Sequence, residues 1–262
     1  VLDNLVTGFQ WAIDDRAVFV EGHAGDTELV EELIKTHGIK SILHFAGSIV
    51  VPESVENPLK YYQNNTATTR NLIEAAVKGG VEHFIFSSTA AVYGMTGNDP
   101  VFEDAQLNPM SPYGRSKLMS EMMLQDVAAA HPMRYGVLRY FNVAGADPRG
   151  RLGQSTPRAT HLIKVACQAA LGQRDQMQIF GTDYDTPDGT ALRDYIHVSD
   201  LVGAHGLLLN YLRDGGLSTT LNCGYGRGYS VREVVETVKN VTGVDFTAEE
   251  TARRAGDPAA VV

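Results

Sequence analysis

The sequence predicts an α/β fold built around a parallel sheet. Short runs of consecutive apolar residues alternate along the chain with longer segments in which apolar residues recur at helical spacing. A strand that is apolar along its whole length has both faces buried, which is typical of parallel sheets covered by helices. The intervening helices provide the right-handed crossovers that connect parallel strands. The 262 residues suffice for one large domain or two smaller ones.

The first part of the chain supplies the elements of this sheet. A strand ends near Asp3, and a second strand covers residues 17–21. The helix that follows ends at His37, because Asp26 is a suitable N-terminal cap and Gly38 a suitable stop. Three further strands are predicted at residues 41–46, 83–89 and 135–143, and two helices at residues 58–78 and 111–131.

The remainder of the chain is predicted to form a smaller lobe of mixed α/β structure. A segment rich in glycine, proline and arginine covers residues 145–157, and a loop rich in aspartate, threonine and glycine covers residues 182–190. Helices are predicted at residues 159–171, 198–212 and 230–241, and strands at residues 176–181 and 219–223. We therefore expect residues 1–145 to form the main domain. Residues 146–262 form mainly the smaller lobe, with some segments returning to the main sheet.

The composition excludes several classes of partner. The net charge of −9 argues against a nucleic acid or an anionic membrane as the main partner. No apolar run approaches the length of a membrane span, and the eight histidines form no metal-binding pattern. Cys167 and Cys223 provide no disulfide framework, which indicates reduced thiols and a cytoplasmic location.

Asp3 is the first candidate cofactor residue. In a dinucleotide-binding fold a glycine-rich loop follows the first strand, and an acidic residue about 20 positions later binds the adenosine ribose. Asp3 suits this acidic position, although an Asp-Asn pair also occurs in ordinary turns. A carboxylate favours NAD over NADP, because it would repel a 2′-phosphate.

The glycine loop itself would precede residue 1. The predicted fold class is therefore a Rossmann-type doubly wound parallel sheet whose first βα unit is missing, with a smaller mixed α/β substrate lobe. We expect the chain to be an internal segment of a longer protein, truncated at both ends, and expect it to bind NAD weakly without that loop.

Tyr113 and Lys117 are the candidate catalytic pair. In a helix, residues i and i+4 share one face, so the lysine ammonium would lie near the phenol. A nearby positive charge favours the phenolate and lowers a tyrosine pKa from its usual value near ~10, which would make Tyr113 a general base. Taken alone, the pair could equally belong to a solvated helix face. The hydroxyl cluster Ser87-Ser-Thr89, at the end of an apolar run upstream, strengthens the catalytic interpretation.

Several short motifs occur in an order that is typical of one enzyme family. They are Asp3-Asn4, His44-Phe-Ala-Gly47, Tyr61-Tyr-Gln-Asn64-Asn65, Ser87-Ser-Thr89, Tyr113-x-x-x-Lys117 and Leu138-Arg-Tyr-Phe-Asn142. With them the chain resembles the extended short-chain dehydrogenase/reductase family, and within it the enzymes that invert C4 of UDP-hexoses. The second half strengthens the resemblance with Ile179-Phe-Gly-Thr-Asp-Tyr184, Asp188-Gly-Thr-Ala-Leu-Arg-Asp-Tyr-Ile-His-Val198 and Arg253-Arg-Ala-Gly-Asp257.

This resemblance implies an activity, a cofactor and an assembly. The activity is an isomerase reaction of galactose metabolism, the NAD-dependent interconversion of UDP-glucose and UDP-galactose. We expect it of the longer parent protein, and we expect the chain as given to be inactive. In it C4 is oxidised, the 4-keto sugar rotates, and reduction on the other face inverts C4 with no net redox change. The resemblance also implies a homodimer formed through the helices at residues 58–78 and 111–131.

The resemblance implies individual roles as well. Tyr113 would be the base, Lys117 would bind the nicotinamide ribose and lower the tyrosine pKa, and Thr89 would hydrogen-bond the sugar 4-oxygen. The other implied cofactor contacts are Asp3, Asn4, Phe45, Ala46, Gly47, Asn64, Ser87 and Tyr140. The implied contacts of the nucleotide sugar, besides Thr89, are Asn142, His161, Leu162, Gln178, Phe180, Arg193, Arg254, Asp257 and Val261. Arginines suit a diphosphate because they bind it bidentately.

Other readings of the sequence stay open. A dehydratase is disfavoured, because Ser88-Thr89-Ala90 lacks the acidic pair that such enzymes use to eliminate water. An epimerase of another UDP-sugar is harder to exclude, whether the sugar is a pentose, a uronate or an N-acetylated hexose. Val261 favours the last of these, because members restricted to unsubstituted hexoses tend to carry a bulky tyrosine there. A truncated, inactive homologue that acts as a folded binding module is the alternative outside enzymes.

Overall fold

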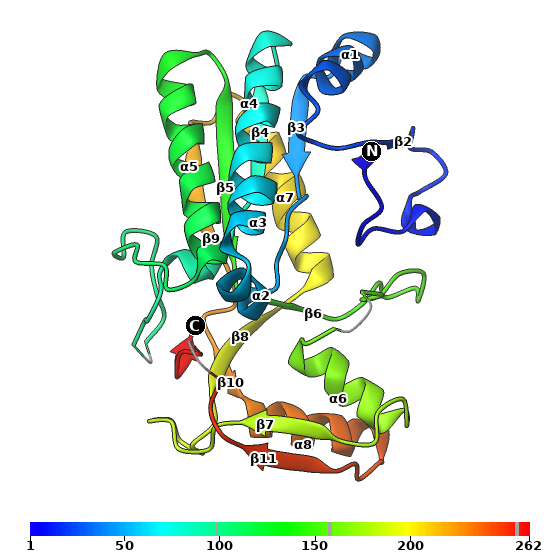
Figure 1. The fold of residues 1–262 in the computed structure, drawn as a ribbon, viewed down its shortest axis with the longest axis vertical. Coiled ribbons are helices and arrows are strands. Elements are labelled where there is room, and N and C mark those ends of the chain that lie inside the picture. The colour runs from blue at the N-terminus through cyan, green and yellow to red at the C-terminus, as the bar shows by residue number, and fades with distance from the viewer. Residues whose placement is uncertain (98, 157–158, 255–256) are drawn as a thin grey trace. The chain divides into compact units, whose positions relative to one another are not determined.

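The computed structural model describes residues 1–97, 99–156, 159–254 and 257–262 (Figure 1). The chain forms two compact units, each made of several segments. Unit 1 contains Val1–Gly94, Gln106–Tyr140 and Val202–Cys223. Unit 2 contains Met95–Ala105, Phe141–Leu201 and Gly224–Val262.

Unit 1 is built on a parallel four-stranded sheet with the order β3-β4-β5-β9. Its strands are Ser41–His44 (β3), His83–Ser87 (β4), Arg134–Tyr140 (β5) and Thr219–Cys223 (β9). A separate parallel pair is formed by Leu2–Asp3 (β1) and Val20–Glu21 (β2). The prediction of a parallel α/β sheet is confirmed.

Helices cover both faces of this sheet. The helix α1 begins after Asp26, whose side chain accepts from Leu29 N, and ends at Gly38 in the left-handed conformation, as predicted. Figure 1 shows α4 and α5 on one face of the sheet and α7 on the other. The helices that contribute to unit 1 are Thr27–His37 (α1), Val51–Glu56 (α2), Pro58–Tyr61 (α3), Thr68–Lys78 (α4), Pro112–Ala130 (α5) and Val198–Arg213 (α7).

The predicted helix at residues 58–78 differs from the structure in its middle. Residues Tyr62–Ala67 form a π-helical segment (η2) between α3 and α4. Such segments are rare and are frequent at functional sites. This one contains Asn64 and Asn65, whose poor helix propensity was the sequence signal.

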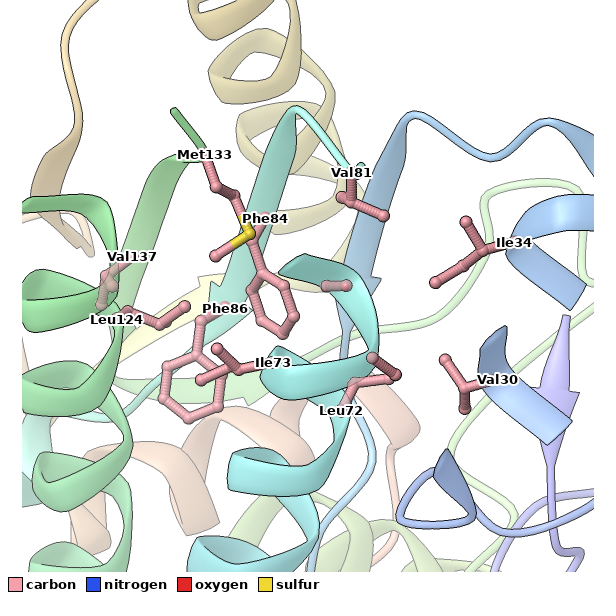
Figure 2. Close-up of a cluster of buried hydrophobic side chains, with 12 residues drawn as sticks. Val30, Ile34, Leu72, Ile73, Val81, Phe84, Phe86, Leu124, Met133 and Val137 are labelled. Atoms are coloured by element: carbon pink, nitrogen blue, oxygen red, sulfur yellow. The ribbon is translucent and has the colours of Figure 1, made fainter. Parts of the chain in front are cut away.

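The core of unit 1 lies between β4 and the helices α1, α4 and α5 (Figure 2). Phe84 and Phe86 point into it together with Leu72 and Leu124. Ile85 lies on the opposite face of the strand, as the two-residue period requires. Burying one such side chain completely stabilises the fold by roughly 1.5–3 kcal/mol. The fully buried β4 therefore gives its C-terminal end, where Ser87 and Thr89 lie, a rigid support.

Unit 2 contains shorter, mixed sheets. Its central strand β8 pairs with β10, β12 and β6, and β7 pairs with β11. The strands are Asn142–Ala144 (β6), Met177–Phe180 (β7), Leu192–His197 (β8), Gly228–Ser230 (β10), Ala248–Thr251 (β11) and Ala260–Val261 (β12). Two helices, Leu162–Ala170 (α6) and Val231–Thr242 (α8), pack on β7 through a core that includes Ala166, Ile179 and Val235.

Two expectations about strands were wrong. The predicted strand at residues 135–143 is broken, because β5 ends at Tyr140 and β6 pairs with β8 in unit 2. The strand β8 was not predicted, because its apolar residues are interrupted by Arg193, Asp194 and His197. Polar residues inside a strand interrupt the apolar pattern by which a strand is recognised in a sequence.

The Asp188-Gly-Thr motif has a structural task. Asp188 Oδ1 accepts hydrogen bonds from Thr190 N at 2.8 Å and from Thr190 Oγ1 at 2.7 Å. Its other oxygen accepts from Ser230 Oγ at 2.5 Å, and Ser230 caps α8 in a capping box with Glu233. Gly189 has φ +80°, and a Cβ there would collide with Thr182 O. The motif therefore fixes the 182–190 loop to the start of α8.

Within the described part of the chain, no helix has the length and apolarity that a membrane crossing needs. The same residues contain no cluster of three His, Cys, Asp or Glu side chains placed to hold a metal ion.

Candidate functional site

Thr89, Tyr113 and Lys117 come together at the C-terminal end of β4. The helix α5 starts there, because Ser111 accepts from Gly114 N at 3.1 Å and Pro112 occupies the first turn. Lys117 Nζ donates to Ser87 O at 3.1 Å. The Thr89 hydroxyl acts on the Tyr113 phenol and lowers its pKa, which favours the phenolate. The structure thus brings the three predicted catalytic side chains into one cluster.

Burial dominates the electrostatics of this cluster. Tyr113 is 7% exposed and Lys117 is 2% exposed. Removal from water raises the pKa of Tyr113 well above its usual value, and the neighbouring Tyr140 adds to the effect. Removal from water also lowers the pKa of Lys117 to about 8. The expectation that the lysine lowers the tyrosine pKa was wrong for the protein without ligand, because burial is the largest effect on the Tyr113 phenol and Lys117 is not among the groups that shift its pKa.

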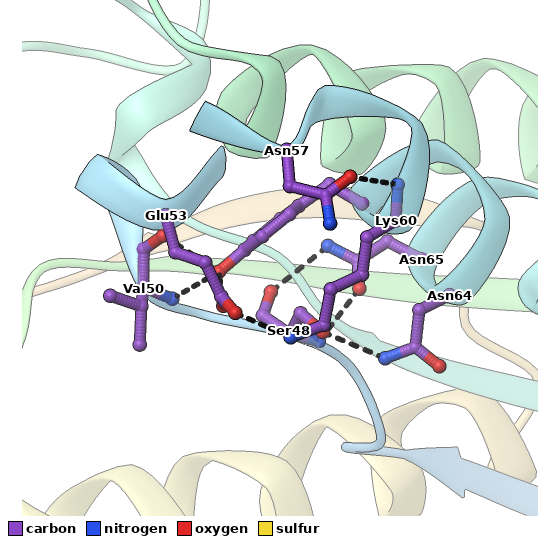
Figure 3. A network of polar contacts seen from close by, with 8 residues as sticks. Ser48, Val50, Glu53, Asn57, Lys60, Asn64 and Asn65 are labelled. Carbon is purple, nitrogen blue, oxygen red and sulfur yellow. Dashed lines mark hydrogen bonds and ion pairs between the residues drawn. The ribbon is translucent and has the colours of Figure 1, made fainter. Parts of the chain in front are cut away.

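Asn65 fixes the loop that follows β3 (Figure 3). It is 2% exposed. Its side chain accepts from Ser48 N at 2.7 Å and donates to Ser48 O and to Ser116 Oγ, both at 3.0 Å. Asn64 Nδ2 donates to Ser48 Oγ at 2.9 Å. The π-helical turn therefore points both amides at Ser48, and Asn65 joins this loop to α5.

Gly47 lies between the Asn65 side chain and Lys117. A Cβ on Gly47 would lie 3.1 Å from Asn65 Oδ1 and 3.4 Å from Lys117 Nζ, which is crowded. Among the described residues, Lys117 Nζ has one hydrogen bond, to Ser87 O, although an ammonium has three donors. Space at Gly47 and spare donors on Lys117 fit a ribose with its two hydroxyls. These residues thus fit a bound dinucleotide.

Other predicted cofactor residues surround the same strand end or lie at β1. Phe45 and Ala46 are exposed after β3, while Ser87 Oγ hydrogen-bonds Tyr140. Asp3 Oδ1 accepts from Leu5 N at 2.7 Å, and a Cβ on Gly8 would lie 2.7 Å from both Asp3 oxygens. Asn4 accepts from Val6 N in a similar turn. The glycine therefore leaves space beside the Asp3 carboxylate.

His205 was missed by the sequence reasoning. It lies in α7, and its Nε2 is 2.8 Å from Ser87 Oγ. Its ring is 4.8 Å from that of Phe45 and 6.5 Å from that of Tyr140. The signal was a single histidine within the apolar stretch Leu201–Leu209 of α7. It could have been recognised only by knowing which strand α7 covers.

In unit 2, three predicted substrate residues, Arg193, Arg254 and Asp257, form one charged cluster, and the predicted Phe180 and Val261 lie beside it. Asp257 accepts from Arg193 NH2 at 3.2 Å and from Arg254 Nε and NH2 at 3.0 and 2.8 Å. The Arg254 guanidinium lies 4.8 Å from the Phe180 ring centre. Val261 is the β-sheet partner of Arg193. Two guanidinium groups sharing one carboxylate leave a net positive charge, which suits a diphosphate.

The remaining predicted substrate residues have diverse settings in unit 2. Asn142 pairs with Tyr195 between β6 and β8. Gln178 shares a face of β7 with Phe180. His161 Nδ1 is 2.7 Å from Gln154 Nε2, and the following Leu162 packs against the α6–β7 core. Among the described residues, no hydrogen bond joins these side chains to Arg193, Arg254 or Asp257.

Comparison with known proteins decides the family. The chain matches the NAD dependent epimerase/dehydratase family over residues 1–224. The chain belongs to the NAD dependent epimerase/dehydratase family. This confirms the resemblance seen in the sequence.

Individual members of the NAD dependent epimerase/dehydratase family match the whole chain. It is 57% identical over 261 residues to a UDP-glucose 4-epimerase of Azospirillum brasilense, covering 100% of this chain and 75% of the relative. The crystal structure of UDP-glucose 4-epimerase from Brucella ovis in complex with NAD matches with a TM-score of 0.95 and 45% identity. That match covers 99% of this chain and 79% of the other. The UDP-Glc/GlcNAc 4-epimerase of Campylobacter jejuni matches with a TM-score of 0.84 and 51% identity, over 100% and 81% of the two chains.

Proposed function

We propose that this chain is an isomerase that interconverts UDP-glucose and UDP-galactose with NAD as its cofactor. The observation that carries the proposal is the cluster of Thr89, Tyr113 and Lys117 at the end of β4. A phenol flanked by a hydroxyl and an ammonium is suited to exchanging a proton with a sugar hydroxyl. Relatives that match the whole chain and carry the name of this reaction specify the sugars.

Each residue of the cluster has a distinct proposed task. Tyr113 removes the proton from the sugar 4-hydroxyl and later returns it. Thr89 hydrogen-bonds the sugar 4-oxygen and the phenol, which aligns donor and acceptor. Lys117 directs its spare donors at the nicotinamide ribose through the space beside Gly47. NAD, when bound, supplies the acceptor for the C4 hydride and a positive charge near the phenol.

The high pKa of Tyr113 in the protein alone fits this division of tasks. A buried phenol stays protonated at neutral pH until positive charge is added beside it. Tyr113 is therefore expected to become a base only in the loaded enzyme.

The two units share the binding tasks in this proposal. Unit 1 holds the cofactor through Asp3, Asn4, Phe45, Ala46, Gly47, Asn64, Ser87 and Tyr140, together with Tyr113 and Lys117. Unit 2 holds the nucleotide sugar, with Arg193 and Arg254 at the diphosphate and Phe180 beside them. Strong contacts at the diphosphate and few at the hexose leave the sugar free to present either face.

The direct test is turnover of UDP-galactose by the NAD-loaded protein. Tyr113→Phe should reduce kcat by a factor of about 10²–10⁴, because the proton acceptor is lost while the ring and its packing stay. Tyr211→Phe, at the exposed end of α7, is the matched control and should keep wild-type turnover. Near-normal kcat for Tyr113→Phe would refute the catalytic assignment.

A second substrate is favoured by Val261. This valine is the sheet partner of Arg193, so a larger residue would project beside the proposed diphosphate site. The Campylobacter jejuni structure, a UDP-Glc/GlcNAc 4-epimerase, is among the matches. We therefore propose that the chain also interconverts UDP-GlcNAc and UDP-GalNAc. Val261→Tyr should abolish turnover of UDP-GalNAc and keep that of UDP-galactose; equal turnover of both by the variant would contradict this.

We further propose a cytoplasmic homodimer. Val55, Leu59, Met119 and Met122 expose apolar side chains on α2, α3 and α5, which pack against one another within unit 1. Such side chains support a helical interface with a second copy. Light scattering should give twice the chain mass, and Met122→Glu should reduce it to one chain mass. A monomeric wild-type protein would contradict the dimer.

A further inference from the structure

Lys117 of the catalytic cluster is buried together with two further charged side chains, Glu121 and Arg139. Lys117 is 2% exposed, Glu121 is 0% exposed and Arg139 is 4% exposed. Glu121 lies one helical turn after Lys117 in α5, and Arg139 lies in β5. Buried charges are costly unless they are paired and hydrogen-bonded, so this cluster calls for an explanation beyond packing.

Glu121 is the centre of a continuous network within unit 1. It accepts from Arg139 NH2 at 2.6 Å and from Arg139 Nε at 3.1 Å. Its Oε1 also accepts from Ser88 Oγ. Arg139 NH1 donates to Tyr93 OH at 2.9 Å, and Tyr93 OH donates to Asn222 Oδ1 at 2.7 Å. The carboxylate thus ties α5 to the strand end that presents Ser87 and Thr89.

The surroundings of Lys117 contain few charges. From β3 it faces His44, whose pKa burial lowers to about 3, so that this imidazole is neutral near pH 7. From β4 it meets the Ser87 carbonyl, and from the π-helical segment the neutral Asn65 amide. Glu121, on its own helix, is the charged group that acts on it and raises the pKa of the lysine against the effect of burial.

We propose that Glu121 is a positioning residue for the catalytic cluster. Its contacts with Ser88 and Arg139 hold the end of β4 against α5, and its negative charge balances the Lys117 ammonium. This rests on the proposed function, because it is the task of Lys117 there that gives the charge its importance. Arg139 is the buried ion-pair partner of the Glu121 carboxylate, with 2.6 Å between Arg139 NH2 and Glu121 Oε2.

The variants separate charge from packing. Glu121→Gln with Arg139→Gln replaces the ion pair by a neutral hydrogen-bonding pair, so that no guanidinium remains buried without a partner. Glu121→Gln alone and the charge-keeping Glu121→Asp complete the set. Asp126→Asn removes a carboxylate from the exposed side of the same helix and is the matched control.

The first measurement is the free energy of unfolding of the chain between about pH 6.5 and 9, which does not involve catalysis. Folded Lys117 loses its proton near pH 8, whereas an unfolded lysine keeps it to about 10.4. The unfolded state therefore binds more protons in this window, and stability rises as pH increases through 8. In the double variant this rise should begin at a lower pH, by on the order of one pH unit. Glu121→Asp and Asp126→Asn should keep the wild-type profile.

The second measurement is the pH profile of kcat in the NAD-loaded protein. Its alkaline limb should move to lower pH in the double variant and in Glu121→Gln, and stay in place in Glu121→Asp. An unfolding profile that is unshifted in both charge-removing variants would overturn the inference. If the unfolding profile of the variants shifts as expected but the wild-type protein never epimerises UDP-galactose, the proposed function is refuted and the inference about Glu121 stands. The two failures are therefore distinguishable.

Discussion

The two units treat their functional charges in opposite ways. In unit 1 the side chains of Glu121 and Arg139 are 1% and 5% exposed, and their contacts are satisfied within the protein. In unit 2 the side chains of Arg254 and Asp257 are 43% and 23% exposed, although they too form an ion pair. In the proposed function, the buried pair acts on a catalytic group, and its burial fits that task because electrostatic interactions are strong away from water. The pair in unit 2 is proposed to meet the ligand, and its exposure fits that task because the ligand has to reach it.

The largest expected effect comes from breaking the buried pair. Arg139→Leu leaves the Glu121 carboxylate buried without its cation, which should reduce the free energy of unfolding by about 3–5 kcal/mol. Denaturant unfolding at neutral pH checks this. Arg115→Leu, at an exposed arginine of α5, the helix that carries Glu121, is the control and should change stability by less than about 0.5 kcal/mol. A similar small change for both variants would mean that the buried pair contributes nothing special to unit 1.

Removing the buried lysine should separate activity from stability. Lys117→Met deletes the ammonium but keeps much of the apolar stem, so kcat should fall by a factor of about 10²–10³. The free energy of unfolding should stay the same or rise, because an ammonium with one hydrogen bond is costly to bury. Steady-state kinetics and denaturant unfolding measure the two quantities. Parallel losses in both would show that Lys117 is mainly structural.

Some features of both units could be predicted from the sequence, and others could not. The parallel sheet follows from apolar runs such as Phe84-Ile-Phe86, whose neighbours are helices. The spacing of Tyr113 and Lys117 predicts only that they share a helix face, and their grouping with Thr89 rested on the resemblance to the family. The β5–β6 break could not be predicted, because Leu138 to Val143 is apolar enough to continue as one strand. Glu121 and His205 escaped for a related reason. Their partners are 18 and 118 positions away in the chain, and only the packed structure brings them together.

The burial of Tyr113 is a second limit on prediction from the sequence. Spacing correctly places a lysine one turn away, but the sign of the pKa shift depends on how much water the fold removes. Desolvation and an opposite charge act in opposite directions on a phenol. The local sequence pattern predicts which charged residue lies near the phenol, but only the tertiary structure determines how deeply the phenol is buried.

His44 makes the stability of unit 1 sensitive to acid. Burial lowers the pKa of its imidazole to about 3, whereas an unfolded histidine titrates near ~6.5. Between these values the unfolded state binds the extra proton, so stability is lost as pH falls below about 6.5. This group alone should cost about 2 kcal/mol of unfolding free energy between about pH 7 and 5. His44→Gln should flatten that part of the profile, while His37→Gln on the exposed end of α1 should not; identical profiles would rule His44 out as the cause.

The smallest effect on stability is expected from the exposed pair of unit 2, where binding should change instead. Arg254→Leu leaves Asp257 paired with Arg193 and should alter the free energy of unfolding by at most about 1 kcal/mol. The loss of a bidentate cation should raise KM for UDP-galactose about tenfold and leave kcat nearly unchanged, because the contact is the same in ground and transition states. Arg253→Leu is the neighbouring control, since Arg253 pairs with Asp183 and stacks on Tyr184. An equal rise in KM for both variants would mean that unit 2 attracts its ligand by overall positive charge and not by the arginines that share Asp257.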